Sequence, residues 1–77
     1  MNRKRRQKLA SVKQMLTEVI YHVEQVLDEE QNCADNYPEN LTSSEKFDQI
    51  EDVIENLSEA IEKLEDALQN ISNSISS

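Results

Sequence analysis

Apolar residues in the second half of the chain recur at the spacing of a helix that packs along another helix. Nine consecutive apolar positions alternate steps of three and four residues: Phe47, Ile50, Ile54, Leu57, Ile61, Leu64, Leu68, Ile71 and Ile75. This is the heptad pattern, in which positions a and d form one seam. It predicts a long helix over residues 43–73. Residues 74–77 are expected to fray, because serine and asparagine are weak helix formers.

The first half of the chain carries a similar pattern with a broader apolar stripe. Steps of three and four residues connect Leu9, Val12, Leu16, Val19, Val23 and Val26. With Leu9 at position a, Met15 falls at position g, and Ile20 and Leu27 fall at position e. This pattern predicts a helix over residues 4–31 whose apolar stripe is wider than a single seam.

The segment between the two patterns, residues 32–42, has no periodicity and contains Pro38 among several Asn and Asp residues. The run from Thr42 to Glu45 matches a capping box, in which a hydroxyl and a carboxylate satisfy free amide groups at a helix start. Two helices of similar length with a short connection favour an antiparallel hairpin. Residues 1–77 are therefore predicted to form one all-α helical-hairpin domain.

Two helices cover only one seam, and the flanking apolar positions would remain in water. Bundle helices typically carry such a wide stripe. We therefore expect two hairpins to form a homodimeric four-helix bundle, with a trimer as an open alternative. The residues expected in self-association are Met15, Leu16, Val19, Ile20, Val23, Leu27, Val53, Ile54, Leu57, Ala60, Ile61, Leu64, Ala67 and Leu68.

Composition agrees with an all-α fold and narrows the chemistry. The chain has no glycine and one proline, whereas strand-rich domains use glycine in turns and bulges. Cys33 is the only cysteine, which excludes an internal disulfide and fits a reducing cytoplasm. No apolar run reaches the roughly 20 residues of a membrane helix. The sequence predicts a soluble cytoplasmic protein.

Charge is distributed unevenly along the chain, although the net charge is −8. Residues 1–13 hold six of the eight Lys and Arg residues, while all sixteen Asp and Glu residues follow them. The cationic start is a candidate for contact with nucleic-acid phosphates or with an anionic membrane, but aromatic residues for base stacking and bulky membrane anchors are missing. The cations concerned are Arg3, Lys4, Arg5, Arg6 and Lys8.

The favoured interpretation of these cations is structural. An antiparallel hairpin brings the start of the first helix beside the end of the second. We therefore expect the basic segment to lie near Glu62, Glu65 and Asp66, which would offset the unfavourable charge at a helix N-terminus. The acidic remainder has two interpretations: a solvated face, which is favoured, or a mimic of nucleic-acid phosphates.

Candidate catalytic and metal-binding residues are few. His22 is the single histidine, and no Glu-x-x-His pair of the kind found in bundle metal sites occurs. Cys33 has no histidine nearby in its loop to act as a base. We expect no enzymatic activity, no cofactor and no bound metal.

The sequence around the predicted turn resembles a known group of proteins. The run LDEEQNCADNYPENLTSSEKF is similar to small helical proteins of phages and mobile elements in Gram-positive bacteria. The matching positions are Glu29, Glu30, Gln31, Asp35, Asn36, Pro38, Glu39, Leu41, Ser44 and Glu45. The resemblance implies an origin and not an activity.

Together these features predict a non-enzymatic module that binds itself and an unknown protein partner. The alternatives are an acidic inhibitor that mimics nucleic acid, directed against a host nucleic-acid enzyme, and a weak nucleic-acid binder that uses the basic N-terminus.

Overall fold

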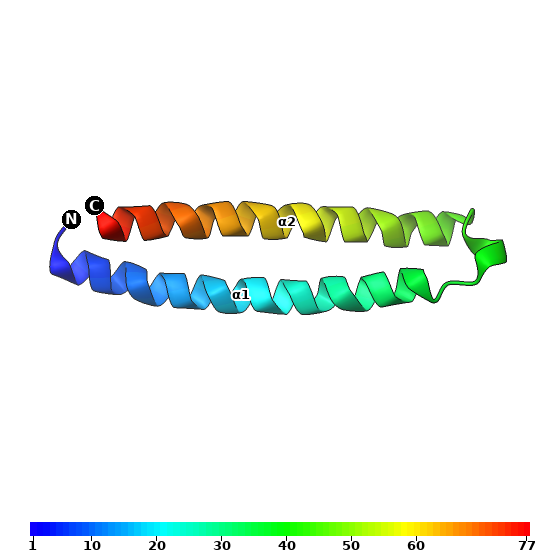
Figure 1. The fold of residues 1–77 in the computed structure, drawn as a ribbon, viewed down its shortest axis with the longest axis horizontal. Coiled ribbons are helices and arrows are strands. Elements are labelled where there is room, and N and C mark those ends of the chain that lie inside the picture. Colours follow the sequence, from blue (N-terminus) through cyan, green and yellow to red (C-terminus); the bar gives the residue numbers. More distant parts are fainter.

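Two long antiparallel helices joined by a short turn make up the whole molecule (Figure 1). The computed structural model describes all 77 residues. Helix α1 (Arg3–Asp35) leads through a 3-10 turn, η1 (Glu39–Leu41), into helix α2 (Glu45–Ser76). The hairpin is a rod of 59 × 14 × 13 Å with both chain ends at the same end. The predicted all-α helical hairpin is confirmed.

Both helices begin at a polar residue that satisfies a free amide group. The Asn2 side chain accepts from the Arg5 backbone N–H at 2.9 Å. The Ser44 hydroxyl accepts from the Phe47 backbone N–H at 3.2 Å. The capping box predicted from Thr42 to Glu45 is therefore wrong, because Ser44 caps α2. The Thr42 hydroxyl instead donates to the Glu39 carbonyl at 2.9 Å, within the turn.

We expect Ser44→Ala to lower the free energy of unfolding by about 0.5–2 kcal/mol, the usual cost of losing such a cap. Urea unfolding at one fixed protein concentration measures this. Ser43→Ala is the matched control, because Ser43 is exposed and precedes the cap. Equal losses in the two variants would contradict the assignment of Ser44 as the cap.

Helix α1 continues to Asp35, four residues beyond the predicted end. Ala34 is half-buried and extends the inward side of the helix by one turn. Asn36 then closes the helix, since its side-chain amide donates to the Asn32 carbonyl at 2.8 Å. Beyond it, the rings of Tyr37 and Phe47 pack with centroids 5.2 Å apart and cover the turn end of the seam.

The C-terminal segment is helical to Ser76, so the fraying predicted from residue 74 is not observed. Serine hydroxyls bond back to carbonyls one turn earlier: Ser74 to Asn70 at 3.0 Å and Ser76 to Ser72 at 3.1 Å. Ile75 is half-buried. Packing and these local hydrogen bonds offset the weak propensity of the segment.

All nine seam residues predicted for α2 are buried or half-buried, as the heptad pattern requires. The seam of α1 differs from the prediction. Its inward side chains are Leu9, Val12, Leu16, Ile20, Val23, Leu27, Glu30 and Ala34.

The heptad assignment of Val19 and Val26 is therefore wrong. Their side chains are 46% and 47% exposed, whereas Ile20 is only 7% exposed. The step from Leu16 to Ile20 is four residues, where a strict heptad would have three, and this shifts the seam by one position. Such a shift is expected because a straight helix has 3.6 residues per turn and drifts from a strict seven-residue repeat. Isoleucine and leucine also bury more apolar area than valine.

The core is thin. Ile20 and Ile61 are the only buried residues, and they lie near the middle of their helices. Every other seam side chain keeps partial contact with water. A single hairpin thus covers much less apolar surface than its sequence provides.

Candidate interaction surface

Several large apolar side chains remain in water outside the seam. Met15 is 57% exposed and Val53 is 41% exposed, alongside Val19 and Val26. Ala60 and Ala67 continue the same row on α2, half-buried and exposed respectively. We call these six residues the apolar face: Met15, Val19, Val26, Val53, Ala60 and Ala67.

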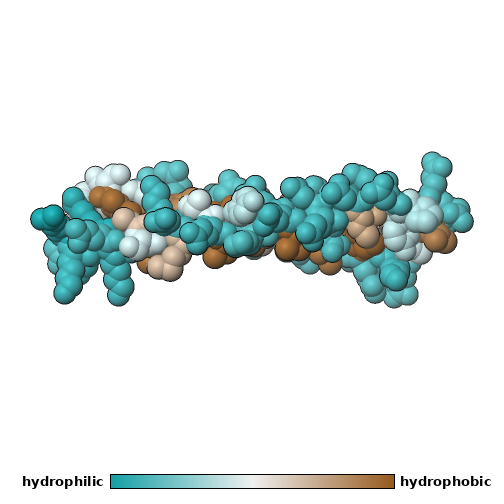
Figure 2. Space-filling view, turned by 90° about the horizontal axis from the view of Figure 1, so that it is seen from below, coloured by the Kyte–Doolittle hydropathy of each residue, from teal (hydrophilic) through white to brown (hydrophobic).

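Helical geometry places all six residues on one side of the rod. At about 100° per residue, the members on α1 lie on the flank that precedes its seam, and so do the members on α2. The helices run in opposite directions, so these two flanks border the same side of the hairpin. Figure 2 shows this arrangement as apolar side chains along one long edge of the rod, the lower edge in that view.

The opposite side of the rod is mainly polar. Its flank on α1 carries Lys13, Thr17 and Glu24, and its flank on α2 carries Ser58 and Glu65, all of them exposed. Tyr21 is the one large apolar side chain on this side; it is 59% exposed, and its hydroxyl accepts a hydrogen bond from Gln25. The upper edge in Figure 2 is accordingly mainly hydrophilic. The exposed large aliphatic side chains of the two helices are therefore on one side, in contrast to the scattered single residues that ordinary protein surfaces carry.

The side of the rod that bears the apolar face is large enough for a stable interface. It extends along a molecule 59 Å long and about 14 Å wide. Standard protein interfaces bury about 800 Å² on each partner, which is comparable to the area of this side. The apolar face is also centred lengthwise, because its members lie around Ile20 on α1 and around Ile61 on α2.

The basic segment does not lie beside the acidic residues predicted to neutralise it. The Arg6 guanidinium donates to a main-chain oxygen of Ser77, which fixes the register at this end. Asp66 lies eleven residues before Ser77 and Glu62 lies fifteen before it, so they are about 16 and 22 Å away along the axis. Surface charges are largely screened beyond about 8 Å at physiological salt. The predicted offset by Glu62, Glu65 and Asp66 is therefore wrong.

The neighbours of the basic segment are uncharged. Residues 67–77 contain no Asp, Glu, Lys or Arg. The six cations of residues 1–13 therefore form a basic end of the rod that the chain itself does not neutralise. We call this the basic end, and it comprises residues 1–13 and the adjoining residues 69–77.

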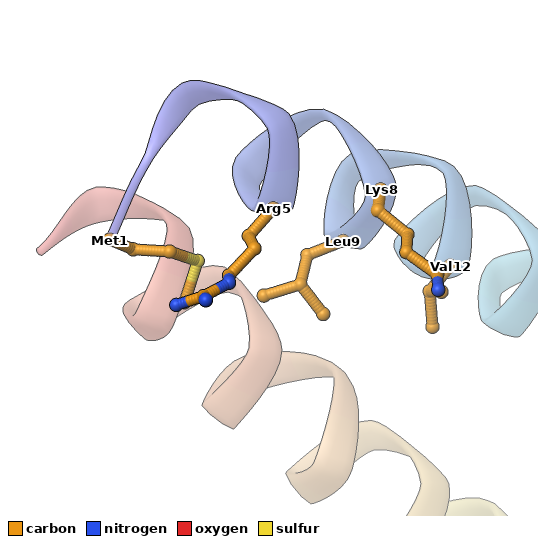
Figure 3. A pocket seen from close by; sticks show the side chains of 5 residues that line it. All are labelled: Met1, Arg5, Lys8, Leu9 and Val12. Atoms are coloured by element: carbon orange, nitrogen blue, oxygen red, sulfur yellow. The ribbon is translucent and has the colours of Figure 1, made fainter.

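A shallow groove opens at the basic end (Figure 3). Its volume is about 260 Å³, and it is lined by Met1, Arg5, Lys8, Leu9 and Val12. In Figure 3 the Met1 and Arg5 side chains extend toward the last turns of α2. The groove combines an apolar floor with two cationic side chains, and it continues the exposed surface of the rod.

Contact between the basic end and nucleic-acid phosphates stays a prediction. Such a contact would give a mobility shift with duplex DNA that weakens as salt rises. Replacing Arg3, Lys4, Arg5 and Arg6 with serine would then abolish it. The absence of any shift at low salt would exclude this contact.

The residues with catalytic or metal-binding potential lie apart and in water. His22 and Cys33 are both exposed. The ring of His22 packs edge-on against Tyr21 with centroids 5.7 Å apart, and Gln25 donates to the Tyr21 hydroxyl at 3.1 Å. No three His, Cys, Asp or Glu side chains are grouped so that they could hold a metal ion. Neither helix has an apolar stretch sufficient to cross a membrane.

Comparisons with protein-family models, with curated proteins and with solved structures gave no match to this chain. The fold and the apolar face define the protein as a helical hairpin with a one-sided apolar surface. Functional inference therefore rests on this surface and on the distribution of charge.

Proposed function

We propose that this chain is a non-enzymatic protein-interaction module that self-associates through its apolar face. The observation that carries the proposal is the position of the exposed Met and Val side chains of both helices on one side of the rod. An ordinary solvated hairpin has no need of a row of Met and Val along a single edge. A second copy presenting the same face would cover both rows at once.

The proposed assembly is a homodimeric four-helix bundle. Helices in such bundles pack with their axes 8–10 Å apart. Ala60 and Ala67 have small side chains, which lets the facing helices approach closely. Full burial of an exposed Val or Met contributes about 1.5–3 kcal/mol, and about half of that remains to be gained here because each side chain is already partly covered in the hairpin. The cost of association is subtracted from this gain.

A scaffolding or regulatory role toward a further protein partner agrees with these features. The exposed thiol of Cys33 fits a reducing cytoplasm. The similarity of the turn to small proteins of phages and mobile elements supports an origin in such an element. This resemblance contributes to the proposal and adds no activity to it.

Thermal unfolding at several protein concentrations tests the proposal. When folding is linked to association, the melting temperature rises with concentration. We expect the helical circular dichroism signal to melt at a higher temperature as the concentration is increased a hundredfold. A melting temperature independent of concentration would contradict self-association of the folded state.

A second function is favoured by the spacing of carboxylates along α2. Residues 51–66 contain seven Asp and Glu residues, all exposed. At 1.5 Å per residue this gives one carboxylate for about every 3–4 Å of axis. One DNA strand carries a charge about every 3.4 Å. The acidic rod would thus fit the basic channel of a nucleic-acid enzyme.

Displacement of DNA tests this second function. The protein would be titrated into complexes of duplex DNA with basic DNA-processing enzymes, and release of the DNA would be measured. A variant with Glu55, Glu59 and Glu62 changed to glutamine should lose this effect. If wild type and variant release equally little DNA, the mimic function is excluded.

A further inference from the structure

We infer that the two hairpins of the dimer lie with their turns at opposite ends, so that the basic end of each copy contacts the acidic turn end of the other. This inference rests on the proposed self-association and specifies its arrangement. It is carried by the charge of the two ends together with the position of the apolar face.

The two ends of the rod carry opposite charge. The basic end holds six Lys and Arg residues and no Asp or Glu. The turn end, residues 28–52, holds nine Asp and Glu residues against Lys46 alone, a net charge of −8. The basic end includes the start of α1, and the turn end includes the end of α1 and the start of α2, so the two charged regions lie at opposite ends of the rod.

The apolar face does not select the arrangement. It is centred on the middle of the rod, so a second copy covers it equally well with its turn at the same end or at the opposite end. Both arrangements also allow the full length of the two rods to overlap. The choice therefore depends on the charges that border the face.

Charge complementarity favours opposite ends. With the turns together, two basic ends would lie side by side, and so would two acidic ends. With the turns apart, a charge of +6 lies beside a charge of −8 at each end of the bundle. Helices packed 8–10 Å apart bring these groups within about one Debye length at physiological salt, so the charges interact across the interface. Repulsion between like charges therefore disfavours the arrangement in which both turns lie at the same end.

The arrangement also gives the basic end a partner. The five cations from Arg3 to Lys8 lie beside the uncharged end of α2, and the one hydrogen bond from them to that part of the chain joins the Arg6 guanidinium to the main-chain oxygen of Ser77. The turn end of a second copy supplies carboxylates at the matching distance along the rod. The basic end and the turn end are thus complementary surfaces of the same chain.

Energy transfer between labelled copies tests this arrangement. Cys33 is exposed near the turn and is the only cysteine, so it accepts a dye without further substitution. A second version carries Cys33→Ser together with Ser74→Cys, which places the dye at the basic end. The dye pair is chosen so that its transfer distance is shorter than the 59 Å length of the rod.

We expect strong transfer when donor on Cys33 is mixed with acceptor at position 74, and weak transfer when both dyes are on Cys33. Strong transfer between two Cys33 labels with weak transfer in the mixed pair would overturn the arrangement and leave the dimer intact. Absence of transfer in both mixtures would overturn the arrangement and the proposed self-association together. The circular dichroism of each labelled protein controls for folding.

A charge variant provides an independent check. Changing Arg3, Lys4, Arg5, Arg6 and Lys8 to glutamate turns the charge of the basic end from +6 to −4, which has the same sign as the turn end, and transfer in the mixed pair should then fall at least severalfold. Unchanged transfer in this variant would show that charge does not set the arrangement. Melting of the unlabelled variant reports whether it still folds.

Discussion

Changing Val19 to glutamate is expected to convert the dimer into a monomer. Val19 is 46% exposed in the hairpin and lies in the centre of the apolar face. In the dimer each copy would bury an unpaired carboxylate, and burial of an unpaired charge costs several kcal/mol. A loss of about 3 kcal/mol corresponds to a rise in the dissociation constant of more than a hundredfold. Size-exclusion chromatography with light scattering measures the mass directly.

Thr17→Glu is the matched control for this change. Thr17 is exposed on the polar side of the same helix, two positions away, and its hydroxyl only bonds back to the Lys13 carbonyl at 3.0 Å. The control adds the same charge without touching the apolar face. It should keep the mass of the wild type. If Val19→Glu and Thr17→Glu had the same mass, the apolar face would have no role in association.

Ile20→Ala is expected to produce the largest loss of stability of any single truncation in α1. Ile20 is 7% exposed and is one of only two buried residues. Truncation of a buried isoleucine typically costs about 2–5 kcal/mol, which is a large part of the stability of a small domain. Urea unfolding at one fixed protein concentration measures the loss. Ile20→Val, which removes a single methylene, should cost only about 0.5–1.5 kcal/mol.

Val19→Ala distinguishes the observed seam from the heptad prediction. The two residues are adjacent, so the comparison holds the position along the helix nearly constant. The observed seam predicts a smaller loss for Val19→Ala than for Ile20→Ala. If Val19→Ala lowered the free energy of unfolding more than Ile20→Ala, Val19 and not Ile20 would point into the seam, and the observed seam would be wrong.

The sequence predicted the second helix well and the first less well, for a physical reason. In α2 the strict heptad selects the larger member of each adjacent apolar pair, namely Ile54, Ile61 and Leu68, so spacing and size indicate the same seam. In α1, apolar residues occur as adjacent pairs, Val19 with Ile20 and Val26 with Leu27. A strict heptad selects the first member of each pair, while the shift of the seam selects the second. The greater size of Ile20 and Leu27 was the signal that favoured the second choice.

The predicted neutralisation of the basic segment failed because of register. The pairs Arg6–Ser77 and Tyr37–Phe47 show that residues at equal distances from the turn lie side by side. Counting from the turn places Asp66 beside the middle of α1 and leaves the basic end next to the serine-rich tail. The charge of each segment could be predicted from the sequence. Which residues of α2 lie beside the basic segment depends on where the turn begins and ends, and this was known only from the structure.

The apolar face was anticipated in part. Met15 was predicted to flank the seam, and Val53, Ala60 and Ala67 were predicted to take part in self-association. Val19 and Val26 were assigned to the seam itself, and Ile20 and Leu27 to its flank. The exchange of these two pairs places the exposed Val residues of α1 on the same side of the rod as Met15, and this common side supports the proposed association.

Sedimentation equilibrium of the unmodified protein tests the central claim most directly. One chain has a mass of 8.9 kDa, and at micromolar concentration we expect twice that mass together with a fully helical spectrum. A folded, helical species with the mass of one chain over the whole concentration range would mean that the exposed Met and Val residues are stable in water without a partner, and self-association would be wrong.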